Sequence, residues 1–256
     1  MITVKSESEL KLMREAGKLL ADTLGQLAEA CQAGVTTDEI DRQADQIIRH
    51  HGAVPGFLGY NGFPKSLCIS VNEEVVHGIP GARAIENGDI VSLDCGLVYK
   101  GLWADSGRTV MVGEVSNEAE RLVETTRKAL ERGIEQALPG NRVGDISAAV
   151  QKEVEAAGFS VVRNFVGHGI GRNMHEPPQV PNHGQPGTGN LLKPGYVLAI
   201  EPMVNVGGPQ VRVLDDGWTV VTVDGKLSCY SEHTVAVTED GPEVLTLRPD
   251  PVTADV

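Results

Sequence analysis

The sequence has few cysteines, and they do not form a pattern typical of a metal site or a disulfide framework. The four cysteines are scattered and include no CxxC pair; they are Cys31, Cys68, Cys95 and Cys229. A zinc site built on thiolates is therefore not expected. A chain of 256 residues can also bury a large core without disulfides. We expect free thiols, as in a cytoplasmic protein.

Long hydrophobic runs are missing as well. No apolar stretch approaches the ~20 residues that a membrane-spanning helix requires. The N-terminal run MITVKSESELK is polar within a few residues, unlike a secretory signal. These two features predict a protein that stays in the cytoplasm and does not contact a membrane.

Positive charge is scarce relative to negative charge. The chain has 22 basic and 35 acidic residues, which gives a formal net charge of -13 at pH 7. Such a balance disfavours binding to the phosphates of nucleic acids. The acidic excess would suit a cationic substrate, metal ions held by clustered carboxylates, or simple solubility, and composition leaves these three open.

Hydrophobic periodicity predicts four helices in two pairs. Capping-box patterns begin at Ser6 and Thr36, and each precedes apolar residues at helical spacing. A charged helix should begin near Ser116, and a shorter one should run through Ile146. The residues expected to end the four helices are, in order, Gly34, Gly52, Pro139–Gly140 and Gly158.

The two helix pairs belong to an internal repeat. A shift of 106 residues takes Gly34 to Gly140 and aligns the helices. A shift of 107 aligns the strand-like runs GDIVSLDCG and GYVLAIEPM, so that Asp94 corresponds to Glu201. Glycine and acidic landmarks that recur in the same order indicate two copies of one α+β unit.

The closing strands of the two copies also match, which sets Asp105 beside Glu232. We therefore predict an α+β fold with halves of about 1–113 and 114–246 and a short C-terminal tail, 247–256. The halves should pack around a pseudo-twofold axis and share an antiparallel sheet, with helices covering its outer face.

A β-hairpin should bring the two acidic residues of the first half together. A turn centred between Tyr99 and Lys100 would place position i opposite position 199 − i, and therefore Asp94 directly opposite Asp105. Carboxylates that face each other across a strand pair repel, so this pair needs a cation, a shared proton or solvent. In the second half, Glu201 and Glu232 should repel each other in the same way across a longer hairpin.

His168 is a fifth candidate ligand, in the glycine-flanked run GHGIG. Four carboxylates with one imidazole suit a pair of Mn, Fe, Co or Zn ions. Two such ions would generate hydroxide near neutral pH and polarise a carbonyl, which is hydrolytic chemistry. Because His168 has no counterpart in the repeat, the two metal positions should differ in affinity.

Several blocks of the sequence resemble the type I methionine aminopeptidases, the bacterial form within peptidase family M24. The blocks are GYNGFPKSLCISVNEEVVHGIP, DIVSLDCGLVYKGLWADSGRT, GHGIGRNMHEPPQVPN, EPMV and DGWTV…YSEHTV. The resemblance covers nearly the whole chain, with spacings of 11, 63, 33 and 31 between the five candidate ligands. It implies one catalytic domain over 1–256, the pita-bread fold, two divalent metal ions, and removal of the initiator methionine before a small second residue.

The resemblance also implies roles for individual residues. The metal ligands would be Asp94, Asp105, His168, Glu201 and Glu232. Glu201 would in addition act as general acid and base. His77, in HGIP, and His175, in MHEPP, would hydrogen-bond the substrate, with His175 stabilising charge on oxygen in the transition state.

Further positions match the family's substrate pocket and a cation site. The residues that match the pocket for the methionine side chain are Tyr60, Phe63, Cys68 and Trp218. An apolar, sulfur-tolerant wall suits a thioether. The chain departs from the family at Met174, where many relatives carry phenylalanine, so the fine shape of this pocket should differ. The residues that match a monovalent-cation site are Asn72, Glu74 and Ser228.

The expected partner is the N-terminus of a nascent polypeptide at the ribosome, and the family suggests a monomer. A first alternative is a proline-specific peptidase of the same fold. Such relatives usually carry a separate N-terminal domain, for which the short stretch before HGIP leaves no room. A second alternative is a binding protein on this fold without catalysis, which the intact ligand set disfavours.

Overall fold

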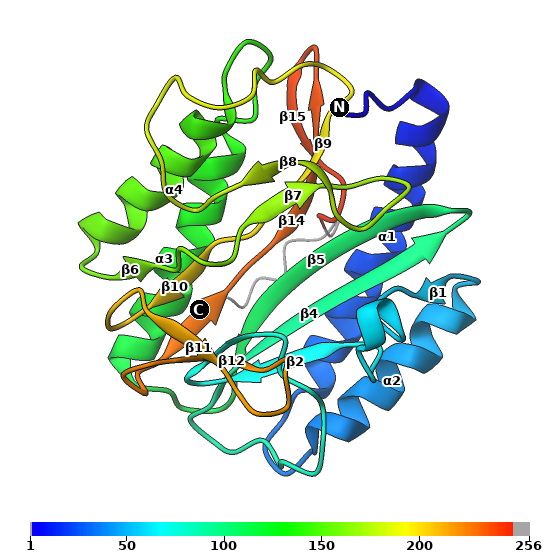
Figure 1. Cartoon of the computed structure of the whole chain (residues 1–256). Coiled ribbons are helices and arrows are strands. Elements are labelled where there is room, and N and C mark those ends of the chain that lie inside the picture. Colours follow the sequence, from blue (N-terminus) through cyan, green and yellow to red (C-terminus); the bar gives the residue numbers. More distant parts are fainter. Residues whose placement is uncertain (1, 248–256) are drawn as a thin grey trace.

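The computed structural model describes residues 2–247 (Figure 1). Its helices are α1 (Glu7–Ala30), α2 (Thr37–His50), α3 (Asn117–Ile134) and α4 (Val143–Ala156), with a short 3-10 turn, η1 (Tyr60–Gly62). The four predicted helices are confirmed, although α3 ends a few residues before the predicted Pro139. Of the predicted tail, 247–256, only Leu247 lies within the described residues.

The first two helices begin where the capping boxes predict. The Ser6 side chain accepts from the backbone N–H of Glu9, and the Glu9 carboxylate accepts from the backbone N–H of Ser6. Thr36 and Glu39 make the same reciprocal pair at the start of α2. Each box satisfies backbone donors that have no partner inside the helix, which fixes the first turn.

Strands follow the first helix pair and again follow the second. The first half contains β1 (Val54–Pro55), β2 (Cys68–Val71), β3 (Glu74–Val76), β4 (Ile90–Tyr99) and β5 (Leu102–Met111). The second half contains β6 (Ser160–Val161), β7 (Gly167–Gly169), β8 (Glu176–Val180), β9 (Val197–Ile200), β10 (Met203–Asn205), β11 (Val211–Val213), β12 (Val220–Thr222), β13 (Ser228–Tyr230), β14 (His233–Thr238) and β15 (Gly241–Val244).

Two antiparallel sheets meet at the centre of the molecule. In the first, β4 pairs with β5 along one edge and with β1 and β2 along the other. The second has the order β15-β14-β9-β7-β8. A backbone bridge between Gly107 of β5 and Glu232, just before β14, joins the two sheets. Strands from both halves of the chain therefore meet at one place.

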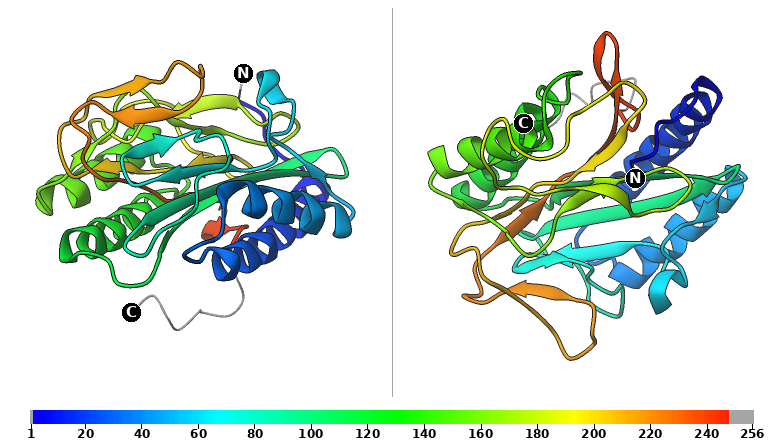
Figure 2. Two further views of the ribbon diagram at one scale, coloured as in Figure 1. Left: turned by 90° about the horizontal axis from the view of Figure 1, so that it is seen from below. Right: turned by 45° about the horizontal axis from the view of Figure 1, so that its top comes forward.

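The helices cover one side of these sheets, as Figure 2 shows. Leu20 of α1, Ile40 of α2 and Leu93 of β4 share one buried cluster. Leu122 of α3 and Val150 of α4 share another with strand residues of the second half. Each helix pair thus packs chiefly on the strands of its own half, although Leu10 and Met13 of α1 also share a cluster with strands of the second half. This leaves the opposite face of the strands for the site.

The hairpin of β4 and β5 differs from its predicted register by two residues. Tyr99 pairs with Leu102, so the two-residue turn is Lys100–Gly101, with φ of 50° and 81°. Two central residues with positive φ make the turn type that matches strand twist in tight hairpins. Asp94 therefore pairs with Gly107, and Asp105 pairs with Gly96. The prediction that the two aspartates face each other directly is wrong.

The corrected register still leaves the two aspartates on the same face of the sheet, as diagonal neighbours. Such neighbours lie ~7–8 Å apart, within reach of a shared ion. In the second half, Ile200 pairs with His233, which brings the adjacent Glu201 and Glu232 together. No single hairpin joins them, because β10 to β13 intervene in the chain.

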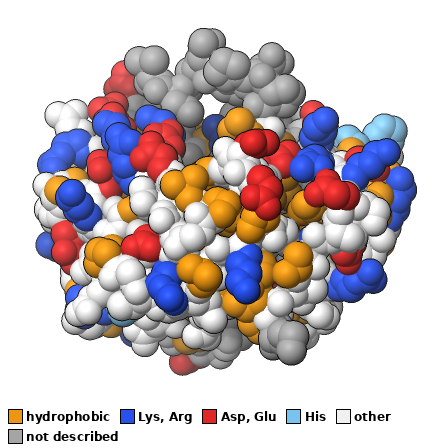
Figure 3. All heavy atoms as spheres, turned by 90° about the horizontal axis from the view of Figure 1, so that it is seen from above, with side chains coloured by type: hydrophobic (Ala, Val, Ile, Leu, Met, Phe, Trp, Pro, Cys, Tyr) orange, Lys and Arg blue, Asp and Glu red, His pale blue; other side chains and the backbone are white. Residues whose placement is uncertain are grey.

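The exterior carries charges of both signs. On the face in Figure 3, acidic and basic side chains are interspersed among the described residues, without a broad basic stripe. This face thus lacks the electrostatic footprint of a nucleic-acid site. Within residues 2–247, no helix is both long enough and apolar enough to cross a membrane.

Candidate metal centre

The five candidate ligands come from five separate segments that converge where the two sheets meet. Asp94 lies on β4, Asp105 on β5 and His168 on β7, whereas Glu201 directly follows β9 and Glu232 directly precedes β14. The bridge between Gly107 and Glu232, together with the pairing of β7 and β9, brings these segments side by side. Residues more than 130 positions apart in sequence thereby share one site.

The ligand atoms lie at distances that suit a shared cation. Asp105, His168 and Glu232 each offer one atom, and these atoms all lie within 4.8 Å of one another. His168 Nε2 is 3.7 Å from Glu201 Oε1 and 4.0 Å from Asp105 Oδ2. The chain thus contains a buried Asp/His/Glu group able to bind metal.

Three carboxylate oxygens at this place have no hydrogen-bond partner among the described residues. They are Asp94 Oδ1, Asp105 Oδ1 and Glu232 Oε1. A buried acceptor without a partner costs ~1–3 kcal/mol, and more when it is charged. Buried carboxylate oxygens left without a partner fit the needs of divalent ions, which would remove that cost by binding them.

Burial and mutual repulsion make these carboxyls difficult to ionise without a cation. Burial raises the pKa of the Asp105 carboxyl to about 7. Burial, followed by repulsion from neighbouring carboxylates, raises the pKa values of Asp94, Glu201 and Glu232 well above their usual range. A metal ion would reverse both effects and hold all four carboxylates in their ionised form.

His168 is held in the form that a metal requires. Its Nδ1 lies 2.9 Å from the carbonyl oxygen of Gly169, which can only accept, so Nδ1 carries the ring proton. The lone pair is then on Nε2, the atom that faces Asp105 and Glu201. Burial lowers the pKa of His168 to about 4, which keeps the ring neutral.

Residues behind the ligands fix their positions. The Thr234 hydroxyl donates to the carbonyl of Asp105 at 2.7 Å and accepts from its backbone N–H at 3.1 Å. Asn182 Nδ2 donates to the carbonyl of Glu201 at 3.0 Å. Tyr230 donates its hydroxyl hydrogen to Glu232 Oε2 at 2.5 Å.

Sequence reasoning missed Tyr230. Its position two residues before Glu232, in a run with strand-like alternation, was a signal that its side chain would share a face with a ligand. Tyrosine is also common in cores, which explains why that signal is weak.

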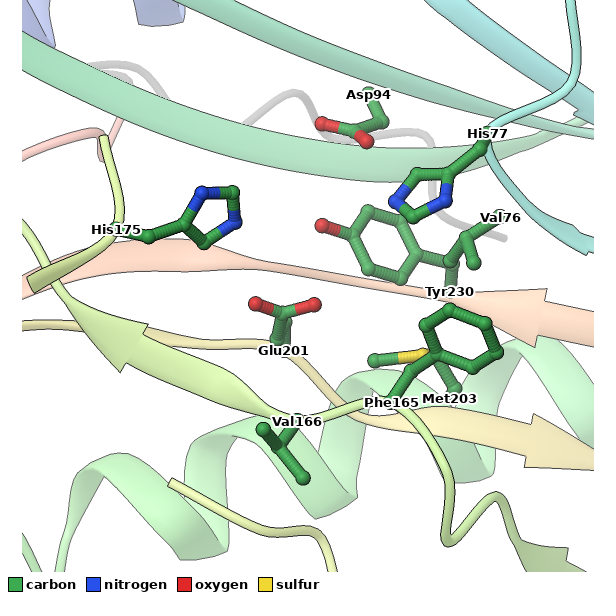
Figure 4. A pocket seen from close by; sticks show the side chains of 9 residues that line it. All are labelled: Val76, His77, Asp94, Phe165, Val166, His175, Glu201, Met203 and Tyr230. Atoms are coloured by element: carbon green, nitrogen blue, oxygen red, sulfur yellow. The ribbon is translucent and has the colours of Figure 1, made fainter. Parts of the chain in front are cut away.

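A pocket opens beside the ligands (Figure 4). Its lining residues are Val76, His77, Asp94, Phe165, Val166, His175, Glu201, Met203 and Tyr230. Both predicted substrate histidines therefore lie on the wall of the same pocket as Asp94 and Glu201. Figure 4 shows the two rings entering from opposite sides, with the carboxylates between them.

The two pocket histidines have different surroundings. His77 has a left-handed backbone (φ 61°), and its ring meets the edges of Phe165 and Trp218. Burial lowers its pKa to about 4. The Nδ1 of His175 lies 2.8 Å from the Tyr60 hydroxyl, and its ring centroid lies 4.3 Å from that of His168. Burial also lowers the pKa of His175, although the residue is more open to solvent.

The predicted methionine pocket forms an apolar cluster next to the ligands. Phe63 and Cys68 are buried in it, and Met174 and Trp218 pack against it. Cys68 pairs with Asp94 across β2 and β4, so the apolar wall and the carboxylates share one sheet face. Tyr60 borders this cluster, because its ring is edge-on to Trp103, which also packs against the cluster, and its hydroxyl is bonded to His175.

The predicted monovalent-cation residues are brought only partly together. The backbone N–H of Ser228 donates to the carbonyl of Asn72 at 2.8 Å. The side chains are bonded to the protein itself, since Asn72 donates to Asp89 and Ser228 donates to Asn205. The Glu74 carboxylate accepts from the backbone N–H of Val71. A cation site here stays a prediction.

The sequence profile of metallopeptidase family M24 matches residues 11–239, and the chain therefore belongs to this family. Within it, the chain stands among the methionine aminopeptidases. A methionine aminopeptidase of Clostridium perfringens is 56% identical over 247 residues, which span 96% of this chain and 99% of that protein.

The fold agrees with this placement. The crystal structure of methionine aminopeptidase from Rickettsia prowazekii superimposes with a TM-score of 0.95 at 42% identity, covering 96% of this chain and 100% of that one. The predicted pita-bread α+β fold is confirmed, and so is the predicted class, a metal-dependent peptide hydrolase.

Relatives with another specificity share the fold alone. Prolidase from Pyrococcus furiosus superimposes with a TM-score of 0.78 at 22% identity, covering 96% of this chain and 66% of that one. The much higher identity to methionine aminopeptidases favours that interpretation over a proline-specific peptidase.

Proposed function

We propose that this protein removes the N-terminal methionine from nascent polypeptides that carry a small second residue. The observation that supports this most strongly is the position of the apolar cluster of Phe63, Cys68 and Trp218, directly beside the buried carboxylates. An apolar pocket with a sulfur-containing wall suits a thioether side chain. A scissile bond one residue away would then lie over the carboxylates.

The metal centre would consist of two divalent ions of Co, Mn, Fe or Zn, held by Asp94, Asp105, His168, Glu201 and Glu232. Ions bound there would lower the pKa of water and polarise the scissile carbonyl. The unpartnered oxygens of Asp94, Asp105 and Glu232 support this assignment. The single imidazole among four carboxylates makes the two positions chemically unequal.

Glu201 is the proton carrier in this proposal. Its side chain is 12% exposed and lies both among the ligands and on the pocket wall. Burial raises the pKa of its carboxyl, which suits a group that takes a proton from the attacking water and passes it to the leaving amine.

His77 and His175 bind the substrate backbone in this proposal. The Tyr60 hydroxyl can donate to Nδ1 of His175, which leaves the Nε2–H of that ring as a donor toward the pocket. A donor fixed in this way stabilises the charge that develops on the carbonyl oxygen in the transition state. His77, on the opposite wall, would hold the substrate chain in place.

The protein acts as a monomer with a single catalytic domain, in the cytoplasm, on chains that emerge from the ribosome. A monovalent cation at Asn72, Glu74 and Ser228 would stabilise the strands behind the pocket.

The experiment that tests the function compares Met-Ala-Ser with X-Pro peptides, using purified protein supplied with Mn²⁺ or Co²⁺. The proposal predicts turnover of Met-Ala-Ser and little turnover of X-Pro. Faster turnover of X-Pro would favour the proline-specific alternative. No peptidase activity with any of the metals would favour a binding protein.

A further inference from the structure

Tyr230 is held in place on both sides by neighbouring strands. It pairs with Met203 across β10 and β13. The Thr109 hydroxyl of β5 donates to its carbonyl at 2.7 Å and accepts from its backbone N–H at 3.3 Å. The residue is 3% exposed. A tyrosine fixed at its backbone in this way has little freedom to place its ring elsewhere.

The opposite strand leaves room for the Tyr230 ring. A Cβ atom added at Gly107 would lie 2.1 Å from Cε1 of that ring, which no packed structure tolerates. Gly107 is the residue that pairs with Asp94 and bridges to Glu232. A glycine therefore stands at a position of β5 where a side chain would displace the tyrosine.

The Tyr230 hydroxyl reaches one of the candidate ligands. It donates to Glu232 Oε2 at 2.5 Å, whereas Oε1 of the same carboxylate has no partner among the described residues. A hydrogen bond to Oε2 restricts rotation of the Glu232 carboxylate about the terminal torsion of its side chain. The direction of Oε1 is then fixed as well. Figure 4 shows the hydroxyl directed toward the space between Asp94, Glu201 and His175.

We infer that Tyr230 is a positioning residue that holds Glu232 with Oε1 presented to a divalent metal ion. The inference rests on the proposed metal centre, and it does not depend on which peptide is cleaved. Partners that orient a metal ligand commonly contribute 10–100-fold to metal affinity. Burial of the ring between β5 and β10 makes the hydroxyl a fixed donor.

The test measures equilibrium Mn²⁺ binding to metal-stripped protein by titration calorimetry. Tyr230→Phe should weaken binding ~10–100-fold. Tyr196→Phe is the matched control, because Tyr196 is also a buried tyrosine (8% exposed) but lies in a different core cluster. The control should bind Mn²⁺ like the wild type.

A double-variant comparison shows whether the effect passes through Glu232. In a Glu232→Gln background, Tyr230→Phe should cause little further loss of Mn²⁺ affinity, since the carboxylate that it orients is gone. If the phenylalanine variant does not fold, 4-aminophenylalanine and 4-methylphenylalanine at position 230 make the same comparison. The first keeps a donor and should retain affinity, and the second should lose it.

The outcomes separate this inference from the proposed function. Mn²⁺ affinity of Tyr230→Phe within twofold of the wild type would overturn the positioning role. So would a variant whose only change is a higher KM for Met-Ala-Ser, which would make Tyr230 a substrate contact. Failure of the wild-type protein to bind Mn²⁺ would instead overturn the metal centre itself.

Discussion

Glu201 lies both among the candidate ligands and on the wall of the substrate pocket. Its replacement by alanine removes a ligand and the proposed proton carrier together. We therefore expect Glu201→Ala to lower kcat for Met-Ala-Ser by ~10³-fold or more, since general acid–base catalysis alone contributes ~10²–10⁴-fold. Glu243→Ala is the control, because Glu243 pairs with Arg14 at the surface. A kcat near that of the wild type would refute the role of Glu201.

His175 should act mainly in the transition state. Its ring lines the pocket and its Nδ1 is bonded to Tyr60, so its other nitrogen is the one that our proposal assigns to the substrate. We expect His175→Ala to lower kcat ~10²-fold, the usual loss of a fixed donor to an oxyanion, with little change in KM. Steady-state kinetics measures both parameters. A change confined to KM would mean that the histidine binds ground state and transition state equally well.

The pKa values of the buried carboxyls predict how the metal-free protein responds to pH. The folded-state pKa of Asp105, about 7, lies well above its unfolded value of ~3.9, and the other three carboxyls are raised as well. The contribution of these carboxyls to the free energy of unfolding is complete below their unfolded pKa of ~3.9. It is lost as pH rises toward and through the folded-state pKa, which is about 7 for Asp105. His77 and His168, lowered to about 4, act oppositely, but only below their unfolded value of ~6.5.

Metal-free protein should therefore lose stability as pH rises from 6.5 to 8, because the opposing effect of the histidines fades above ~6.5 while the raised carboxyls still titrate. Asp105 alone should contribute a loss of just under ~1 kcal/mol over this range, and the other three carboxyls, whose pKa values are also raised, should add to it. Urea denaturation in the presence of a chelator measures it. Protein saturated with Mn²⁺ should show a smaller slope, because the ion holds the carboxylates ionised. Stability that stays flat or rises over this range without metal would contradict the pKa assignments.

At the scale of single residues, the sequence indicated candidate ligands but not the side chains that orient them. Asp94, Asp105 and His168 could be singled out as candidate ligands because glycine-flanked and strand-like runs surround them. The hydrogen bond from Tyr230 to Glu232 could not, since a tyrosine in a strand most often fills a core. The residues around Tyr230 in the sequence do not predict which polar group its hydroxyl hydrogen-bonds.

At the level of elements, the hairpin of β4 and β5 shows how a short turn sets a site. The alternating pattern correctly predicted two paired strands, but the turn lies one residue later than expected, at Lys100–Gly101. Lys100 adopts a positive φ that its residue type gives no reason to expect. A turn shifted by one residue changes the register by two, which keeps Asp94 and Asp105 on one face.

The N-terminal segment should position the loop that carries His175. Lys5 Nζ lies 2.8 Å from Glu176 Oε2, and the two side chains are only 2% and 7% exposed. The other oxygen of Glu176 accepts from the backbone N–H of Asn173. The missing Cβ of Gly171 leaves space for Lys5, because an added one would lie 2.2 Å from its Cε. This buried pair ties the 171–176 loop to the body of the protein.

We expect Lys5→Met to lower the free energy of unfolding by ~3–5 kcal/mol, because it leaves Glu176 charged and buried. Hydrogen exchange in residues 171–176 should also become faster, and kcat should fall several-fold. Arg14→Met is the matched control, since the Arg14–Glu243 pair is 36% exposed on each side and should contribute less than ~1 kcal/mol. Equal effects of the two substitutions would remove any special role for Lys5.

At the level of the whole molecule, the repeat was the most informative sequence feature. Capping boxes, glycine stops and the shift of 106–107 residues predicted two helix pairs and two sets of strands, all of which are present. β7 pairs with β9 in the second half as β2 pairs with β4 in the first. His168 pairs with Ala199, and the corresponding pair in the first half is Ser70 with Ser92, so the first half has a serine where the second has the histidine.

Because His168 breaks the twofold symmetry of the ligands, the two positions of the proposed metal centre should differ in affinity. The carboxylates form two pairs related by the repeat, Asp94 with Glu201 and Asp105 with Glu232. The Nε2 atom of His168 lies 4.0 Å from Asp105 Oδ2 and 3.7 Å from Glu201 Oε1. One metal position therefore gains an imidazole that the other lacks, and the two should fill at different concentrations.

The most direct test of this account is a titration of metal-stripped protein with Mn²⁺ or Co²⁺. Metal content, heat of binding and turnover of Met-Ala-Ser are measured in parallel, by elemental analysis, calorimetry and a peptidase assay. We predict no turnover without metal, recovery of turnover as Mn²⁺ or Co²⁺ binds, and two binding steps of unequal affinity. Turnover that persists in protein shown by elemental analysis to be free of metal would contradict the central claim. Two equal and indistinguishable steps would contradict the asymmetry that His168 introduces.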